Sequence, residues 1–352
     1  IDPGSEWRLH RQWYDRSAMG DLLGEDFAIA QSDTLYRCLD LLLAHKEALF
    51  SFLQQRWRTL FEARFEVLLY DLTSTYFECD PPESGKRRFG YSRDKRFDCV
   101  QVVIALIVTP EGFPLGYEVL PGNTVDNQTL KDALAKIEAR YGKAERVWVM
   151  DRGIPTEASL AVMRGSDPPV HYLVGTPKGR LSKLEKSFLG KPWEQVRDEV
   201  EVKLLVEDDE TYVLASSAGR RHKERAMRKR RLRRLCKRLH ELQAQAPQRD
   251  QLLLKIGAAK KEAGRAFSLV KIRLPKPDEA VTPETFAFTL DRKKLRQVRR
   301  REGRYLLRSN LTDEDPAKLW TYYIQLTEVE QAFNLETAVD RFSERASCCF
   351  YC

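Results

Sequence analysis

Three acidic residues stand out because apolar residues surround each of them. Asp71 follows the apolar run Val67-Leu68-Leu69-Tyr70, and Asp151 follows Val147-Trp148-Val149-Met150. In an α/β sheet, an acid after such a run lies at the C-terminal edge of a buried strand, where ligands bind. For either residue alone, a strand that ends in a turn-forming Asp is an equally good interpretation. Two such acids on separate strands favour a shared site.

Glu330 differs because it falls within an apolar helical stripe. At about 100° per residue, one helix face gathers Leu319, Tyr323, Leu326, Glu330, Phe333 and Thr337. Asp315 is a good N-cap for this helix, and Pro316 suits its first position. A carboxylate on an apolar face is costly unless an Arg pairs with it or a metal ion binds it. The pattern alone leaves both interpretations open.

Together the three acids predict a particular chemistry. Carboxylates that converge without clustered His or Cys favour a hard cation, Mg²⁺ or Mn²⁺. Two such ions about 3.5–4 Å apart activate a nucleophile and stabilise the leaving oxygen of a phosphodiester. The sequence therefore predicts a site for two divalent metal ions held by Asp71, Asp151 and Glu330.

One segment has a net positive charge larger than that of the whole chain. Residues Arg220–Arg238 hold twelve Lys or Arg and one Glu, a net charge of +11, so the rest of this +8 chain carries about −3. A nearly single-sign run favours contact with a nucleic acid over a merely solvated helix. The candidate phosphate contacts are Arg228, Lys229, Arg230, Arg231, Arg233 and Arg234.

The elements that must position these residues predict an α/β fold, a mixed sheet flanked by helices. A helical lead-in is expected over residues 1–64, and the first part of the sheet core over 65–178. The pattern of expected strands and helices changes over residues 179–308, which are interpreted as an insertion. It is expected to contain a β-hairpin and then basic helices that break near Pro247. A C-terminal helix is expected within 309–342, followed by an irregular tail over 343–352.

Bulk properties exclude several classes of protein. Apolar residues make up 42% of the 352 residues, and no run approaches the length of a membrane span. The first residues do not resemble a secretory signal. The seven cysteines are odd in number and irregularly spaced, so a reducing cytoplasm is the expected location.

Four blocks resemble those of a known family. The segments Asp71–Glu78, Gly90–Asp94, Gly122–Asp126 and Asp151–Gly153 are similar, in order and spacing, to the motifs of bacterial insertion-sequence transposases of the DDE class. Around its glutamate this group has Tyr, two residues, Arg, three residues, Glu, six residues and Lys. Tyr323 and Glu330 fit that signature, whereas Leu326 and Thr337 replace its Arg and Lys.

The resemblance implies a fold and a function. It implies an RNase H-like core whose acids hold metal, with Tyr323 near DNA. Arg152 lies beside Asp151 in the sequence, and a contact with a DNA phosphate and a pair with an acid are equally good interpretations of it. It implies an enzyme that binds terminal inverted repeats, nicks the transposon ends by hydrolysis and joins a 3′-hydroxyl to target DNA. A homodimer assembled on DNA and a location at the bacterial nucleoid follow. An inactive DNA-binding remnant and an RNase H-like nuclease remain as alternatives.

Overall fold

The computed structural model describes residues 8–24, 32–83, 85–91, 96–125, 129–142, 146–312 and 314–326. The chain divides into two compact units, each described here by itself. The first unit comprises Ile1–Lys183, Leu205–Val213 and Leu307–Cys352, and the second comprises Leu184–Leu204 and Leu214–Leu306.

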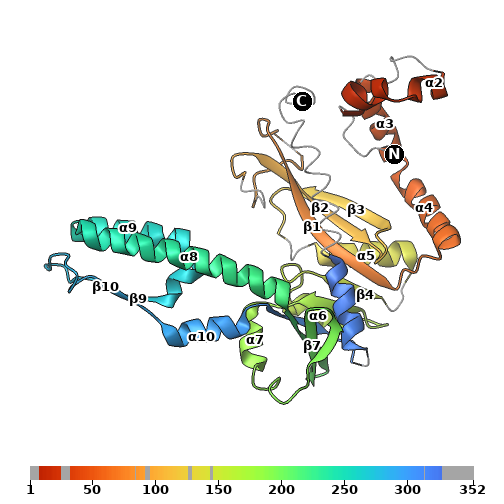
Figure 1. The fold of residues 1–352 in the computed structure, drawn as a ribbon. Helices are drawn as coiled ribbons and strands as arrows, with labels where there is room; N and C mark the ends of the chain where they lie inside the picture. The colour runs from red at the N-terminus through yellow and green to blue at the C-terminus, as the bar shows by residue number, and fades with distance from the viewer. Residues whose placement is uncertain are drawn as a thin grey trace. The chain divides into compact units, whose positions relative to one another are not determined.

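The N-terminal part of the first unit is helical, as the sequence predicts. Its helices are η1 (Leu9–Trp13), η2 (Tyr14–Arg16), α2 (Met19–Leu23), α3 (Ser32–Ala44) and α4 (Lys46–Phe61). Helix α4 lies beside strand β3 (Figure 1). Lys46 Nζ donates to the Tyr117 carbonyl at 2.8 Å, and Gln54 Nε2 donates to the Leu115 carbonyl at 3.3 Å. The lead-in helix is thus held to the sheet by backbone acceptors.

A nine-stranded mixed sheet forms the centre of the fold. Its strands are β1 (Val67–Phe77), β2 (Val100–Val108), β3 (Pro114–Pro121), β4 (Val147–Met150), β5 (His171–Gly175), β6 (Glu194–Arg197), β7 (Val200–Glu207), β8 (Glu210–Ser217) and β11 (Arg304–Ser309). They lie in the order β3-β2-β1-β4-β5-β11-β8-β7-β6. The first three strands pair antiparallel, and β4 and β5 then run parallel to β1. The sheet confirms the expected mixed α/β class.

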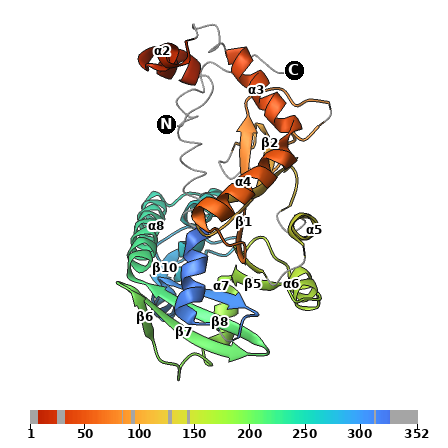
Figure 2. The same cartoon turned by 90° about the vertical axis from the view of Figure 1, so that its right-hand side faces the viewer.

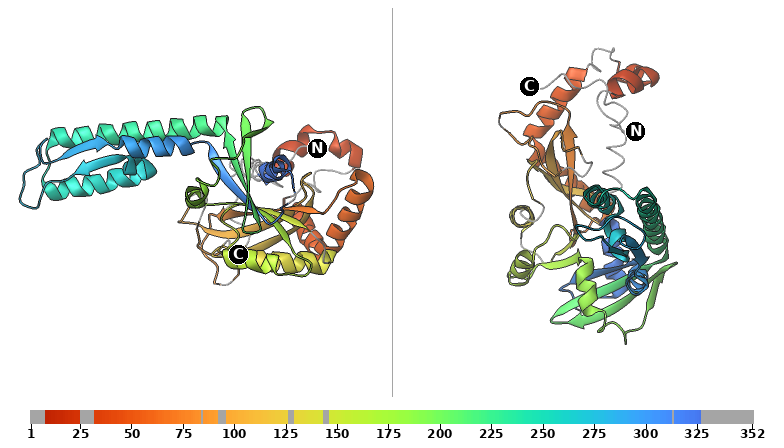
Figure 3. Two further views of the ribbon diagram at one scale, coloured as in Figure 1. Left: turned by 90° about the horizontal axis from the view of Figure 1, so that it is seen from below. Right: turned by 90° about the vertical axis from the view of Figure 1, so that its left-hand side faces the viewer.

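Helices cover the two faces of this sheet differently. Leu68, Tyr70 and Leu72 of β1 face a core with α5 (Leu130–Tyr141) and α6 (Glu157–Arg164). Helical residues 316–326 lie on the opposite face (Figures 2 and 3). That helix begins as predicted, because the Asp315 carboxylate accepts the Ala317 backbone N–H at 2.9 Å. The face opposite the α5–α6 core is the face of Asp71.

One strand differs from its prediction. Asp71 was expected at the C-terminal end of a short strand, but β1 continues through it to Phe77. The continuation forms because Leu72–Phe77 pairs with β2 after β4 has ended at Met150. Asp71 is therefore an internal residue of β1, at the point where the strand loses its parallel neighbour.

The hairpin predicted between Val200 and Ser216 is confirmed, and its strands extend the central sheet. Strands β7 and β8 are joined by Asp208 and Asp209, whose φ angles are 53° and 57°. Two successive positive φ angles are those of a tight hairpin turn. This turn sets the register that buries Glu210, the first residue of β8.

The second unit contains the basic helices. Its further elements are α8 (Ala218–Gln245), α9 (Arg249–Ala263), η5 (Gly264–Leu269), β9 (Val270–Arg273), β10 (Ala287–Leu290) and α10 (Arg292–Arg301). Helix α7 (Lys178–Leu184) ends at the boundary between the units. Helices α8 and α9 lie side by side (Figure 1). Leu235, Leu239 and Leu242 of α8 share a core with Leu252 and Ile256 of α9. The helical hairpin predicted to break near Pro247 is confirmed.

Candidate active site and nucleic-acid interface

Three neighbouring parallel strands place Asp71, Asp151 and Gly175 in one row. Tyr70 pairs with Met150, and Met150 pairs with Val174. Asp71, Asp151 and Gly175 are the residues that directly follow Tyr70, Met150 and Val174, and they form this row. Adjacent strands lie about 4.8 Å apart, so the two aspartates come from adjoining positions. The register thus brings together two of the three acids that the sequence singled out.

In each carboxylate of the row, the Oδ1 atom accepts a hydrogen bond. Asp71 is only 5% exposed, and its Oδ1 accepts the Leu72 backbone N–H at 2.8 Å. Asp151 is half-buried, and its Oδ1 accepts the Tyr323 hydroxyl at 3.1 Å. Two like charges side by side disfavour each other unless a cation lies between them. The donor set, two hard carboxylates, fits Mg²⁺ or Mn²⁺.

The third expected ligand, Glu330, lies outside the described residues, as does Thr337. Among the residues that the structure describes, no group of three His, Cys, Asp or Glu gathers as a metal site. The described site therefore has two acids, and the role of Glu330 stays a prediction.

A pocket of about 440 Å³ lies where the four sequence blocks meet. It is lined by residues of each block: Thr73 and Ser74, Gly90 and Tyr91, Asn123 and Thr124, and Gly153. Its lining is more apolar than polar, and the hydroxyl and amide groups of Thr73, Ser74 and Asn123 offer a few hydrogen-bonding positions within it. The blocks are far apart in the sequence, and the fold brings them to one place.

Close backbone contact explains two glycines of these blocks. A Cβ on Gly90 would lie 1.9 Å from the Gly122 carbonyl oxygen, and one on Gly122 would lie 2.1 Å from the Gln101 carbonyl oxygen. Gln101 Nε2 donates to the Gly122 carbonyl at 2.8 Å. Only glycine fits at either position, because the obstructing atoms belong to the backbone.

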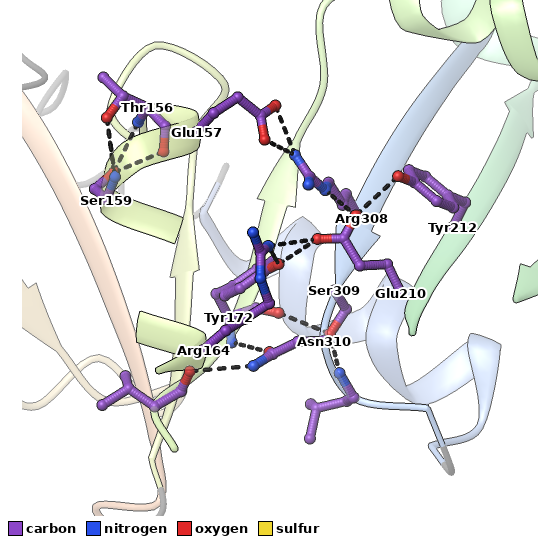
Figure 4. Close-up of polar contacts among 12 residues, drawn as sticks. Thr156, Glu157, Ser159, Arg164, Tyr172, Glu210, Tyr212, Arg308, Ser309 and Asn310 are labelled. Atoms are coloured by element: carbon purple, nitrogen blue, oxygen red, sulfur yellow. Dashed lines mark hydrogen bonds and ion pairs between the residues drawn. The ribbon is translucent and has the colours of Figure 1, made fainter. Parts of the chain in front are cut away.

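A buried ion-pair network, which sequence reasoning missed, lies at the other side of β5 (Figure 4). Glu210 is 4% exposed and accepts hydrogen bonds from Arg164 at 2.7 Å and Tyr212 at 2.8 Å. It also accepts from Tyr172 and from the Arg308 guanidinium. Arg308 in turn donates to Glu157 at 2.8 and 2.9 Å. The network joins β5, β8, β11 and α6 within the first unit.

The network shifts the protonation of its members. Burial raises the pKa of Glu210, but hydrogen bonds from Arg308, Tyr172 and Tyr212 outweigh burial and hold that pKa below its ordinary value. The pKa of Glu157 is likewise lowered, because Arg308 and Arg180 outweigh burial. Burial and the Glu210 carboxylate raise the pKa of Tyr172. Both carboxylates are therefore charged at neutral pH.

The basic residues predicted on α8 fall into two groups. Lys229, Arg230, Arg231, Arg233 and Arg234 are exposed. Arg228 is 12% exposed and forms an ion pair with Glu302, which is 3% exposed. A residue committed to a buried carboxylate is poorly placed to bind phosphate. Arg152, the other expected DNA contact, is exposed in the turn after Asp151.

A second basic helix was missed. Seven of the ten residues of α10 are Lys or Arg, and six of them are exposed. The seventh, Arg301, pairs with Glu185 at 2.6 Å. The signal in the sequence is the density of positive charge in Arg292–Arg301, which is a shorter run than that of α8. The second unit thus carries two basic helices.

The fold and the row of acids define a class, mixed α/β proteins in which adjacent strands carry paired carboxylates. Within it, the family model described as Transposase DDE domain matches residues 64–335, most of the chain. The protein therefore belongs to the DDE transposase domain family. A comparison with curated proteins finds no match.

The search of solved structures matches this chain to two transposase complexes, among others. The cryo-EM structure of a piggyBac transposase synaptic complex with hairpin DNA has 10% sequence identity and a TM-score of 0.40, and the match covers 94% of this chain and 57% of that one. The Mos1 transposase paired-end complex with the left transposon end has 13% identity and a TM-score of 0.21, covering 47% and 58%. The chain thus spans less than two thirds of either protein. Within the described part of the chain, no helix has the length and apolar character needed to span a bilayer.

Proposed function

We propose that the protein is a DNA transposase whose Asp71, Asp151 and Glu330 hold two divalent metal ions, Mg²⁺ or Mn²⁺. The observation that carries the proposal is the row on adjoining parallel strands, which places Asp71 beside Asp151 in a family of DDE transposases. Glu330 joins them on the prediction that its helix keeps the stripe of Tyr323, seven residues earlier.

The reaction has two steps at phosphorus. Water attacks at the transposon end and leaves a free 3′-hydroxyl; that hydroxyl then attacks target DNA, so one phosphodiester bond replaces another. When bound, the metal ions activate the attacking oxygen and stabilise the leaving oxygen. The chain's own residues orient the two acids: the Leu72 N–H donates to the buried Asp71, and the Tyr323 hydroxyl donates to Asp151.

Positively charged side chains hold the DNA. The exposed Lys and Arg of α8 and α10 offer many sequence-independent contacts to phosphates. Arg152 adds a contact next to the metal-holding acids. We further propose that two copies act together on the paired transposon ends, in the bacterial cytoplasm at the nucleoid.

A cleavage and strand-transfer assay with Mg²⁺, on DNA that carries the element's own ends, tests the proposal. Asp151→Asn is expected to abolish nicked and joined products, and removal of metal by a chelator to do the same. Salt-sensitive DNA binding is expected to persist in the variant. Asp132→Asn, at an exposed position of α5, is the matched control and should leave both products unchanged.

The outcomes separate the alternatives. Product that survives Asp151→Asn would refute the assignment of the acids. Cleavage without joining by the unaltered chain would indicate a nuclease. DNA binding without either reaction would indicate a binding remnant.

A further inference from the structure

Gly175 and Tyr323 lie beside Asp151, and their arrangement goes beyond the metal-holding acids themselves. Gly175 is the third member of the row, because Val174 is the last residue of β5 that pairs with β4. It carries no side chain of its own toward the helix formed by residues 316–326. That space is used by a residue from the helix.

Tyr323 fills the place where a side chain at position 175 would lie. A Cβ on Gly175 would be 2.4 Å from the Tyr323 hydroxyl oxygen and 3.2 Å from its Cζ atom. The φ angle of Gly175 is not positive, so the backbone conformation does not demand glycine. Glycine is needed there because any side chain would displace the tyrosine hydroxyl.

The hydroxyl uses this place to hold Asp151. It donates to Asp151 Oδ1 at 3.1 Å. Leu319 and Leu326, on the same helical stripe as Tyr323, are both buried, so the ring is carried by a well-packed helix face. A hydrogen bond to one carboxylate oxygen fixes the rotation of the carboxylate and directs its other oxygen.

We propose that Tyr323 is a positioning residue that orients the Asp151 carboxylate for metal binding. The absence of a side chain at Gly175 leaves the space that the Tyr323 hydroxyl occupies. The inference rests on the proposed function and deepens it. It assigns Tyr323 a place behind a metal ligand, in contrast to the DNA contact that the sequence resemblance implies. Loss of such a partner commonly weakens metal binding about 10–100-fold.

Calorimetric titration of the full chain with Mn²⁺, without DNA, is the primary test. Tyr323→Phe and Gly175→Ala are each expected to weaken Mn²⁺ binding at least about 10-fold. The double variant should be no weaker than Tyr323→Phe, because both changes remove the same hydrogen bond. Additive losses would show that Gly175 acts through another contact and would overturn the pairing.

Matched controls separate positioning from general damage. Tyr322→Phe changes the neighbouring tyrosine, and Gly179→Ala adds a methyl group where nothing lies within 4 Å. Both should bind Mn²⁺ like the unaltered chain. Thermal unfolding of every variant checks the fold, and Tyr323→Phe removes one oxygen without adding volume.

A kinetic test distinguishes positioning from DNA contact. In Tyr323→Phe the Mn²⁺ concentration for half-maximal cleavage should rise, excess Mn²⁺ should restore the rate, and DNA affinity should stay unchanged. Weaker DNA binding with unchanged Mn²⁺ binding would make Tyr323 a DNA contact and overturn the proposal.

The failure of this inference is distinct from the failure of the proposed function. If the unaltered chain binds Mn²⁺ and Asp151→Asn does not, the acids hold metal; equal binding by Tyr323→Phe then refutes the positioning role alone. If the unaltered chain binds no Mn²⁺, the metal site and the positioning role are both refuted.

Discussion

At the scale of residues, the pocket beside the acids depends on the absence of side chains. Gly90 and Gly122 let two loops and β2 approach through their backbones, with Gln101 bonded between them. Backbone atoms cannot rotate away as a flexible side chain would. The pocket is therefore sensitive to the smallest change at these positions.

Gly90→Ala is expected to destabilise the fold by about 1–3 kcal/mol, the usual cost of overpacking. The cause is the Gly122 carbonyl oxygen, 1.9 Å from the added methyl group. Urea unfolding measures the loss, and cleavage should fall with it. Gly179→Ala, whose methyl group would meet nothing within 4 Å, is the control. An unchanged unfolding midpoint for Gly90→Ala would contradict the close contact between Gly90 and the Gly122 carbonyl.

Single residues also show what the sequence predicts and what it does not. Asp151 was predictable because β4 is four apolar residues long and ends before it. The length of β1 was not, because Leu72–Phe77 mixes polar and apolar residues and depends on β2 for pairing. Glu210 and Arg308 bond across 98 residues, so no local pattern identifies them. The role of Glu330 remains a prediction.

At the scale of elements, the basic helices differ in how their charge is used. Exposed residues of α8 and α10 are available to phosphates, whereas Arg228 pairs with the buried Glu302. Charge counts from the sequence cannot separate these groups, because burial depends on which face of α8 packs on the rest of the second unit. The position of α8 in the chain could be predicted from the sequence. Which of its basic residues are exposed and which form buried ion pairs could not.

Alanine at Arg230, Arg231 and Arg234, or at Arg292, Arg296 and Arg299, is expected to weaken DNA binding. Each lost phosphate contact should reduce the slope of log affinity against log salt by about 0.9. Binding measured over a salt series, with duplexes of several sequences, tests this. An unchanged slope for one triple variant would remove that helix from the interface.

Arg228→Ala is the internal control for those variants. It should leave the salt slope unchanged and reduce stability instead, by up to about 3–5 kcal/mol, because the buried Glu302 would keep only its longer ion pair with Arg225, at 3.9 Å. A reduced slope with unchanged stability would place Arg228 among the phosphate contacts.

At the scale of the whole molecule, the sheet is lengthened beyond β5 by strands from a distant part of the sequence. Strand β11 pairs with β5, and β8 follows β11 in the sheet order. The network of Glu210, Arg308 and Glu157 joins these strands to α6 within the first unit. The stability of that unit should therefore depend on the charge of two carboxylates.

The pH dependence follows from the lowered pKa values of Glu210 and Glu157. A carboxyl with a lowered folded-state pKa stabilises the fold above its unfolded pKa, about 4.3. That contribution is lost as the pH falls through the lower, folded-state value. Unfolding free energy should thus fall below about pH 4.

Glu210→Gln removes the titrating charge and should cost about 3–5 kcal/mol at neutral pH. The difference from the unaltered chain should shrink as the pH falls, because protonated Glu210 resembles Gln. Urea unfolding across the acidic range measures both effects. Glu314→Gln, in an exposed pair with Lys318, should cost about 1 kcal/mol or less. A constant difference at all pH values would contradict the role of Glu210.

The turn between β7 and β8 is a place where substitutions can raise the thermal stability of the protein. Asp208 and Asp209 are exposed and both have positive φ, a conformation that costs an ordinary residue about 1 kcal/mol. Asp208→Asn with Asp209→Gly supplies the pair that such turns prefer, and thermal melting should report a higher midpoint. Asp208 and Asp209 are not part of the row of acids. Substitutions in this turn can therefore change the stability of the fold without changing the acids of the proposed active site.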